Sequence, residues 1–256
     1  MQINLNADLG ESFGPWAMGD DPALLEIVNS ANVACGFHAG DPLVMLRTVE
    51  LARDRGVSIG AHPGFPDLQG FGRRPMTLPP AELEAVLLYQ MAALSGVAAA
   101  AGHRMTHVKV HGALSNMACA DRTLSEVISR SIKRFDPSLI LLAPALSPLA
   151  AAGVDDGLTV ALEVFADRTY QEDGQLTPRK LPGSVLHHPE ECVAHVLKLV
   201  EAGGIVTTSG TVLPCAFHSI CLHGDGPEAV ASARAIRAAL LERGHTLAAL
   251  PDLFRG

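Results

Sequence analysis

Short apolar runs alternate with longer segments of helical periodicity along the whole chain. The short runs are partly β-branched, which is typical of buried strands, and the longer segments repeat their apolar positions with the spacing of one helix face. Regular alternation of strand and helix favours a parallel sheet with both faces covered. The predicted strands are 3–8, 31–35, 57–61, 106–110, 139–143, 158–165 and 220–222, and the predicted helices are 41–55, 79–101, 121–134, 189–202 and 227–243.

One region breaks this alternation before the last strand. Segments 205–208 and 211–216 have strand character and are joined at Ser209-Gly210, which predicts an inserted β-hairpin within 205–216. The chain has no internal repeat and no linker that would divide it, and its 256 residues suit one α/β barrel of about 250 residues. We therefore expect a single domain over 1–256, an α/β fold in the form of a distorted (β/α) barrel with about seven parallel strands.

Composition excludes several classes of protein. Apolar residues make up 48% of the chain, enough for a sizeable core, and the net charge of -8 without a basic run argues against a nucleic-acid partner. Five cysteines without a CxxC pair suit a reducing compartment. No signal segment and no uninterrupted apolar run of about 18 residues is present, so we expect a cytoplasmic protein without a membrane span.

Polar clusters follow six of the predicted strands. In a parallel barrel the carboxyl ends of all strands meet at one face, so these clusters are expected to form one pocket of an enzyme. Lys109 and His111 lie two residues apart on the same strand face, where a buried lysine requires a partner or a function. The expected pocket residues are Asp8, His38, His62, Lys109, His111, Glu163, Arg168 and His223.

Each cluster allows a catalytic and a structural interpretation. Asp8 and Glu11 are candidates for a general base or metal ligands, or else Asp8 caps a turn and Glu11 is solvated. Arg73 and Arg74 lie in a loop shaped by proline and glycine, where either would clamp a carboxylate or phosphate, or else pair with a helix carboxylate. The polar loop from Glu163 to about Arg179 is a candidate lid, or else a solvated crossover.

Several familiar nucleotide and catalytic motifs are absent. The chain has no G-x-x-x-x-G-K-[ST] loop, no G-x-G-x-x-G turn after a strand, no G-x-S-x-G elbow and no H-E-x-x-H helix. A nucleotide would have to be held in an unconventional way or by another chain.

Six motifs follow one another over nearly the whole chain. They are NLNADLGESFG (4–14), NVACGFHAGD (32–41), GAHPGFPDLQGFGRR (60–74), VKVHGAL (108–114), EVFADRTY (163–170) and ICLHGD (220–225). Together and in this order they resemble the LamB/YcsF family, whose members are described as the A component of prokaryotic 5-oxoprolinase. Two departures from the family pattern V-K-P-H-G-A-L-Y-N are Val110 in place of proline and Ser115 in place of tyrosine.

The resemblance implies a barrel related to those of glycoside hydrolases and polysaccharide deacetylases. It also implies ATP-dependent opening of 5-oxo-L-proline to L-glutamate, with Mg-ATP as cosubstrate and 5-oxoprolinase subunits B and C as partners. Phosphorylation of the carbonyl oxygen would turn that oxygen into a leaving group and so overcome the stability of the lactam. The expected roles are catalysis by Asp8, Lys109, His111 and Glu163, and substrate binding by His38, His62, Arg73, Arg74, Arg168 and His223.

Within that assignment, Lys109 and His111 would stabilise negative charge on the carbonyl or phosphoryl oxygens, and Asp8 or Glu163 would activate water. Two alternatives remain open. Asp8, His38 and His62 would serve as a divalent-metal ligand set in an amidase or deacetylase that needs no ATP. Alternatively, the chain would be a non-catalytic regulatory component.

Overall fold

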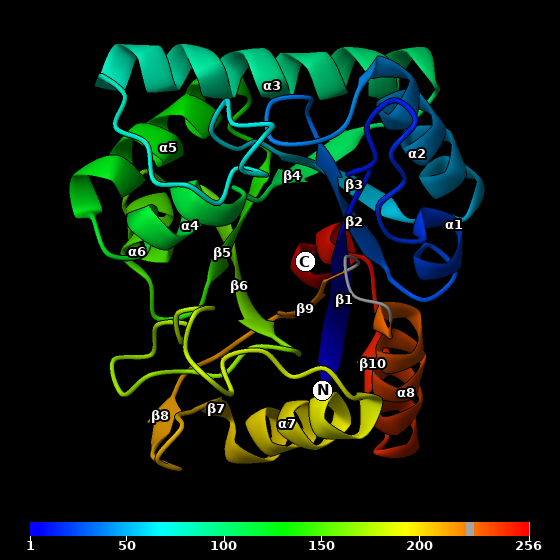
Figure 1. Ribbon diagram of the computed structural model, residues 1–256, viewed down its shortest axis with the longest axis vertical. Coiled ribbons are helices and arrows are strands. Elements are labelled where there is room, and N and C mark those ends of the chain that lie inside the picture. The colour runs from blue at the N-terminus through cyan, green and yellow to red at the C-terminus, as the bar shows by residue number, and fades with distance from the viewer. Residues whose placement is uncertain (224–227, 256) are drawn as a thin grey trace.

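Seven parallel strands form a closed barrel (Figure 1) in the computed structural model, which describes residues 1–223 and 228–255. Each strand pairs with its sequence neighbour, and β9 closes the ring by pairing with both β6 and β1. Every predicted strand overlaps an observed one, so the predicted barrel is confirmed. The strands are β1 (Gln2–Leu9), β2 (Ser30–Ala34), β3 (Ser58–His62), β4 (Met105–Val108), β5 (Ile140–Pro144), β6 (Thr159–Phe165) and β9 (Ser219–Leu222).

Helices surround the barrel on its outside (Figure 1). The five long helices agree with the predicted ranges to within two residues, except that residue 227 lies outside the described part. Asp41 begins α2 by accepting hydrogen bonds from the backbone N–H groups of Leu43 and Val44. The long helices are α2 (Pro42–Asp54), α3 (Pro80–Ala100), α5 (Arg122–Phe135), α7 (Pro189–Ala202) and α8 (Ala229–Glu242).

Short elements fill the connections between these strands and helices. The strands β7 (Gly204–Val206) and β8 (Val212–Pro214) form a separate antiparallel pair beside α7 (Figure 1), in the segment where the sequence predicts a hairpin. The remaining short elements carry too little periodicity to be predicted. They are α1 (Asp21–Leu24), α4 (Gly112–Ala118), α6 (Pro148–Asp155), β10 (Thr246–Leu247) and the 3₁₀ helix η1 (Leu250–Phe254).

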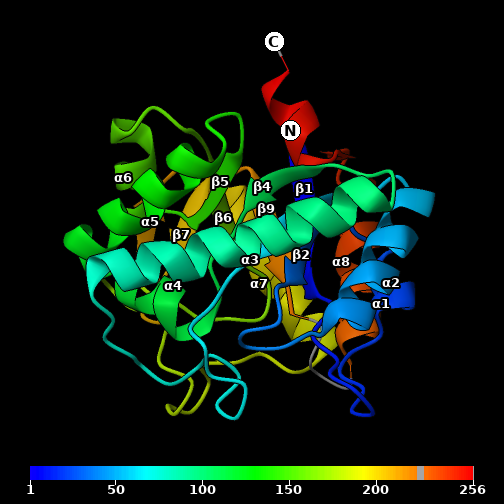
Figure 2. The same ribbon diagram turned by 90° about the horizontal axis from the view of Figure 1, so that it is seen from above.

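Helix α3 is long and apolar enough, by length and composition alone, to cross a membrane. In the folded chain one face of α3 packs on the barrel (Figure 2), with Leu83, Leu87, Met91 and Leu94 buried. A core helix of a globular domain passes the same test, so this helix is weak support for a membrane span.

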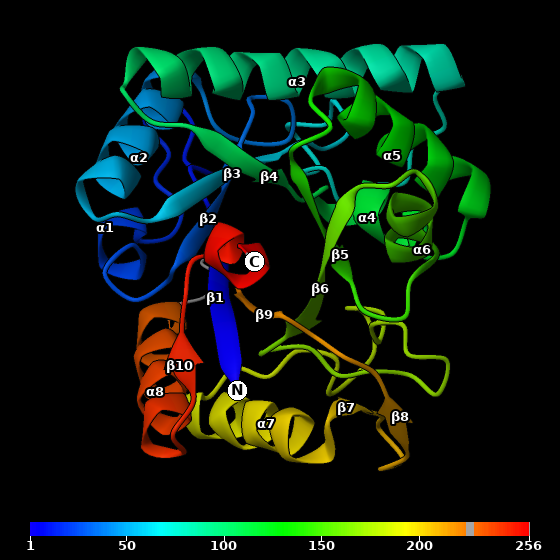
Figure 3. The ribbon, with the colours of Figure 1, turned by 180° about the vertical axis from the view of Figure 1, so that it is seen from behind.

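The two ends of the barrel are different. At the amino-terminal end, η1 lies across the opening (Figure 3), with Leu250 buried against Ile140 and Leu142. The loops that leave the carboxyl ends of the strands project from the opposite side (Figure 2). Because one end is closed by the chain itself, ligands must approach the barrel from the loop side.

The interior of the barrel is polar. Asn4, Asn6 and Asp8 alternate along β1 with the apolar Ile3, Leu5 and Ala7, and all six side chains are buried. Asn4 donates to Ser30 Oγ at 2.8 Å, and Asn6 donates to Ser219 Oγ at 2.8 Å. Buried polar groups are stable only when paired, so this network fixes which strands face one another.

Asn32 connects the middle of this network to Asp8, near the carboxyl end of the barrel. Its amide donates to Asn6 Oδ1 at 2.7 Å and Asp8 Oδ1 at 2.9 Å, and its Oδ1 lies 3.0 Å from His107 Nε2. Burial lowers the pKa of His107 to about 3, so this ring is neutral and donates to Asn32. Gly60 packs directly against the His107 ring and leaves no room for a Cβ atom.

We predict that Asn32→Ala lowers the free energy of unfolding by about 2–4 kcal/mol, because it leaves several buried partners without hydrogen bonds. Asn116→Ala, at an exposed position of α4, should change the stability by less than about 0.5 kcal/mol. Urea denaturation followed by circular dichroism measures both values. Equal stability of the two variants would contradict a structural role for the interior network.

Candidate active site

A buried ammonium group occupies the centre of the carboxyl end of the barrel. Lys109, which follows β4, places Nζ 2.9 Å from Asp8 Oδ1 and 2.9 Å from Glu163 Oε2. Lys109 is only 5% exposed and Glu163 only 1%. Burial alone would lower the pKa of Lys109, but Asp8 and Glu163, together with the contact to Cys221, raise that pKa well above its usual value. Lys109 is therefore a permanent cation that holds two carboxylates together.

The remaining contacts of Lys109 come from weaker groups. Its Nζ lies 3.0 Å from Cys221 Sγ, 3.4 Å from Asn6 Oδ1 and 5.4 Å from the centre of the Phe165 ring. An ammonium has three N–H donors, and a thiol is a weak acceptor. Cys221 is therefore the contact that a substrate oxygen could most easily replace.

Three histidines and a glutamate form the other half of the site. His38 follows β2, His62 ends β3, and His111 is the N-cap residue of α4. The rings of His38 and His111 stack at 3.7 Å, and His62 lies at right angles to both. Glu11, in the loop after β1, places Oε1 3.3 Å from His38 Nε2.

The two halves meet at Asp8, whose Oδ2 lies 3.3 Å from His62 Nε2. Burial alone would raise the pKa of Asp8, but His62 and Lys109 together lower it well below its usual value. Gly72 packs against the histidine half, where an added Cβ would lie 2.7 Å from His38 Cβ and 2.8 Å from His111 Cδ2. The positive φ of Gly72 (59°) also requires glycine there.

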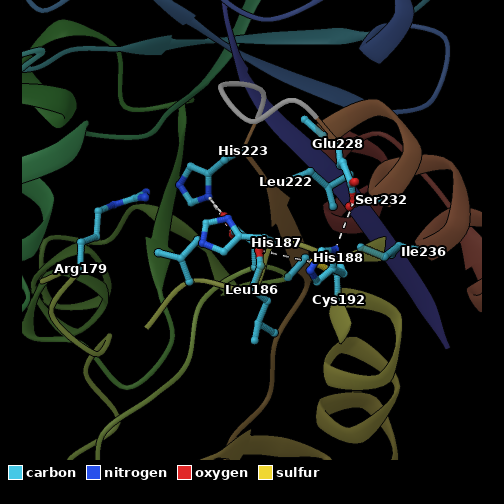
Figure 4. Close-up of a pocket in the computed structure, with 14 residues that line it drawn as sticks. Arg179, Leu186, His187, His188, Cys192, Leu222, His223, Glu228, Ser232 and Ile236 are labelled. Atoms are coloured by element: carbon cyan, nitrogen blue, oxygen red, sulfur yellow. Dashed lines mark hydrogen bonds and ion pairs between the residues drawn. The ribbon is translucent and has the colours of Figure 1, made fainter. Parts of the chain in front are cut away.

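His223 and Asp167 line the side of the site that is open to solvent. His223 Nδ1 lies 2.8 Å from Asp167 Oδ1. Burial alone would raise the pKa of Asp167, but the charge and hydrogen bond of His223, together with Arg179 and Arg168, lower that pKa below its usual value. Both residues line a cavity of about 480 Å³ beside the starts of α7 and α8. Figure 4 shows Arg179 and His223 facing the same part of this cavity.

The three arginines predicted to bind substrate make other contacts. Arg168 is buried and donates to the carbonyl oxygens of Thr177 (2.6 Å) and Ser184 (3.2 Å), so it fastens the loop that follows β6. Arg74 pairs with Asp67 on the loop after β3, and Arg73 lies over the Phe71 ring at 4.8 Å. The structure therefore gives Arg168 a structural task and leaves substrate binding by Arg73 and Arg74 as a prediction.

Residues 3–255 match the LamB/YcsF family. The chain belongs to this family. A relative from Azoarcus sp. (strain BH72), named as the A component of 5-oxoprolinase, is 58% identical over 99% of both chains. A lactam utilization protein from Thermus thermophilus, known from its crystal structure, is 44% identical. The similarity covers 98% of this chain and 100% of the Thermus chain, with a TM-score of 0.91.

Similarity to more distant structures informs only on the fold of this LamB/YcsF chain. The catalytic domain of a peptidoglycan N-acetylglucosamine deacetylase from Eubacterium rectale ATCC 33656 is 12% identical, with a TM-score of 0.53. The similarity covers 97% of this chain and 88% of the deacetylase chain. The barrel is thus of the deacetylase type, as the resemblance implied.

The structure brings most predicted site residues of this LamB/YcsF chain together and adds others. Asp8, Lys109 and Glu163 form the ionic half, and His38, His62 and His111 form the other half with Glu11. Glu11 lies three residues after Asp8 in the motif NLNADLGESFG, where the sequence already indicated a candidate base or metal ligand, although Glu11 was not among the expected pocket residues. Asp167 and Cys221 also lie within predicted motifs, but nothing in their spacing shows that they face His223 and Lys109.

We predict that Lys109→Met lowers the free energy of unfolding by about 3–5 kcal/mol, because it leaves two buried carboxylates without their cation. Adding Asp8→Asn and Glu163→Gln to this variant should recover part of the loss, since the uncompensated charges are then removed. Urea denaturation of the wild type, the single variant and the triple variant tests this. A triple variant as unstable as Lys109→Met would show that lost packing, not charge, is the cause.

Proposed function

We propose that this chain contributes the lactam-opening site of a 5-oxoprolinase, which hydrolyses 5-oxo-L-proline to L-glutamate with consumption of ATP. The names of its relatives support the reaction class. The observation that carries the proposal is the buried arrangement of Asp8, Lys109 and Glu163 at the open end of the barrel. Such a site combines a fixed cation with two carboxyl groups that contact it.

The chemistry of the substrate explains why ATP is needed. The amide of an unstrained lactam is resonance-stabilised, and its nitrogen is a poor leaving group. Transfer of the γ-phosphoryl group of ATP to the carbonyl oxygen would give ADP and an activated ring carbon. Water would then attack that carbon, and the C–N bond would break as the nitrogen takes up a proton, which leaves an acyl phosphate. A second water would hydrolyse this acyl phosphate and release phosphate. The products are L-glutamate, ADP and phosphate.

Lys109 and Glu163 suit two steps of this sequence. The Lys109 ammonium would donate to the carbonyl or phosphoryl oxygen by exchanging its contact with Cys221. Within the described residues Glu163 Oε1 is buried and has no hydrogen-bond partner, whereas Oε2 is held by Lys109. An unpartnered buried carboxylate oxygen is suited to accept a proton from water, so Glu163 is the preferred general base.

Substrate would enter through the cavity beside His223 and Asp167, because the ionic half of the site is almost fully buried. Arg179 lines this cavity and is a candidate partner for the substrate carboxylate. The Asp167–His223 pair would hold or deliver a proton to the departing nitrogen. His38 and His111 would enclose the far side of the pocket.

Partner chains are expected to supply what this chain lacks. The names of its relatives designate one component of several, which indicates a multi-subunit complex. The sequence contains no phosphate-binding loop of a familiar kind. We propose 5-oxoprolinase subunits B and C as the partners, Mg-ATP as the cosubstrate and the cytoplasm as the location.

The direct test is to co-express the chain with subunits B and C and to measure glutamate and phosphate release from 5-oxo-L-proline. Formation of both products should require ATP and all three chains. Turnover without ATP would instead support a metal-dependent amidase, a function favoured by the Glu11–histidine group. Turnover that survives substitution of every site residue would leave this chain with a regulatory role.

We predict that Glu163→Gln lowers kcat of the complex by about 10²–10⁴-fold, the usual effect of losing a general base. The change keeps the size of the side chain and leaves a polar atom in contact with Lys109. Glu126→Gln, which alters an exposed pair with Arg122 on α5, is the matched control and should leave kcat unchanged. Full activity of the Glu163 variant would remove Glu163 from the mechanism.

Kinetic measurements can show which of three arginines binds the substrate carboxylate. We predict that Arg179→Gln raises KM for 5-oxo-L-proline by about 10–100-fold, as expected when a charged hydrogen bond to the substrate is lost. Arg73→Gln and Arg74→Gln are measured in parallel as the competing assignments. A larger KM effect at either of those positions would transfer the carboxylate-binding role to the loop after β3.

A further inference from the structure

Four potential metal ligands converge in the histidine half of the site. Glu11, His38, His62 and His111 are each no more than 8% exposed, and one ligand atom from each lies within 4.8 Å of all the others. His62 Nε2 and His111 Nδ1 are 2.9 Å apart, and Glu11 Oε1 lies 3.3 Å from His38 Nε2 and 3.8 Å from His111 Nδ1. Metal–nitrogen bonds of about 2.0–2.1 Å place the ligands of one ion roughly 3–3.5 Å apart.

The tautomers of two rings are fixed by backbone carbonyl groups. His62 Nδ1 lies 2.7 Å from the carbonyl oxygen of Lys109, and His111 Nε2 lies 2.9 Å from that of Phe71. A carbonyl oxygen only accepts hydrogen bonds, so both of these nitrogens must carry hydrogen. When a ring carries only this one hydrogen, its other nitrogen presents a lone pair.

These two lone pairs face each other across 2.9 Å, because the facing atoms are His62 Nε2 and His111 Nδ1. Two lone pairs at this distance repel unless a cation lies between or beside them. The oxygens of Asp8 and Glu11 add further negative charge around the same point. The arrangement therefore requires either a proton on one ring or a bound metal ion.

A bound metal ion explains the positions of more of these side chains than a proton on one ring does. A proton would satisfy the contact between His62 and His111, and the contact between Glu11 and His38 would then be a separate pair, whereas one ion accounts for the convergence of all four groups. A ring N–H that donates to a backbone carbonyl is the usual orientation of a metal-binding histidine.

We propose that Glu11, His38, His62 and His111 bind one divalent transition-metal ion such as Zn²⁺. Imidazole nitrogens with one carboxylate oxygen suit zinc and its neighbours in the first transition row. Magnesium prefers oxygen ligands, so this site is distinct from the magnesium that accompanies ATP. The ion would lie on the far side of Asp8 from Lys109.

A second group of ligands in the same pocket does not form a comparable site. Asp8, Cys221 and His223 also lie within reach of one another, but the Lys109 ammonium contacts both Asp8 and Cys221. A metal ion there would have to displace a buried positive charge. The metal set expected from sequence, Asp8 with His38 and His62, is thus replaced in our proposal by Glu11 with three histidines.

The test uses the full chain, purified without a histidine tag and treated with a chelator. Titration with Co²⁺, followed by visible absorption and calorimetry, should show one ion bound per chain with the spectrum of nitrogen and oxygen ligands. Glu11→Gln and His62→Gln should weaken this binding by more than about 100-fold, since even loss of an outer-shell partner weakens metal binding 10–100-fold. His245→Gln is the histidine control, because His245 lies beside the amino group of Met1 and outside the proposed site; this variant should bind Co²⁺ as the wild type does.

Two further measurements distinguish loss of metal binding from loss of the folded structure in a variant. Circular dichroism shows whether each variant is folded, and X-ray absorption of the Zn²⁺-loaded wild type should show scattering from several imidazole rings. A folded wild type that binds no Co²⁺, or Zn²⁺ held by oxygen atoms alone, would overturn the proposal. Metal binding is measured without partners, ATP or lactam, so its failure would be distinct from failure of the proposed function.

Discussion

The buried ammonium of Lys109 is the interaction on which the organisation of this barrel depends. It lies between carboxylates delivered by β1 and β6, strands that are neighbours only through β9. A charge in this position is tolerated only with both partners in place. The pairing therefore links the barrel's closure to the geometry of its site, because a strand in another register would leave one of these charges alone.

The polar interior follows from the same constraint. An apolar barrel core would surround Lys109 with groups that cannot stabilise a charge, whereas Asn6 and Asn32 transmit hydrogen bonds from Asp8 toward Ser219 and His107. The outer faces of the strands and the covering helices then supply the apolar packing. The buried charges of the site thus determine that the barrel interior is polar. The free energy of folding comes mainly from the apolar layer between the strands and the helices.

The sequence predicted the strands well because their apolar runs are short and bounded by turns, and it predicted one pocket because parallel strands end at one face. It did not predict α4 and α6, which have seven and eight residues and too few turns to show a period. It also could not predict which side chains meet. Glu11 lies three residues beyond Asp8, yet its partner His38 is set by the turn after β2, and Arg168 points into the loop after β6 because carbonyl oxygens there accept its hydrogen bonds.

The two halves of the site divide the chemistry by the kind of charge they hold. The ionic half contains a fixed cation and the two carboxyl groups that contact it, which suit oxygen stabilisation and water activation. The other half contains three imidazole rings, two of which donate a ring N–H group to a backbone carbonyl oxygen, and such rings suit a borderline cation. Asp8 touches both halves, with Oδ1 toward Lys109 and Oδ2 toward His62. An ion bound by the histidines would therefore act on Asp8 directly, and through it on the charge balance that holds Lys109 and Glu163 in place.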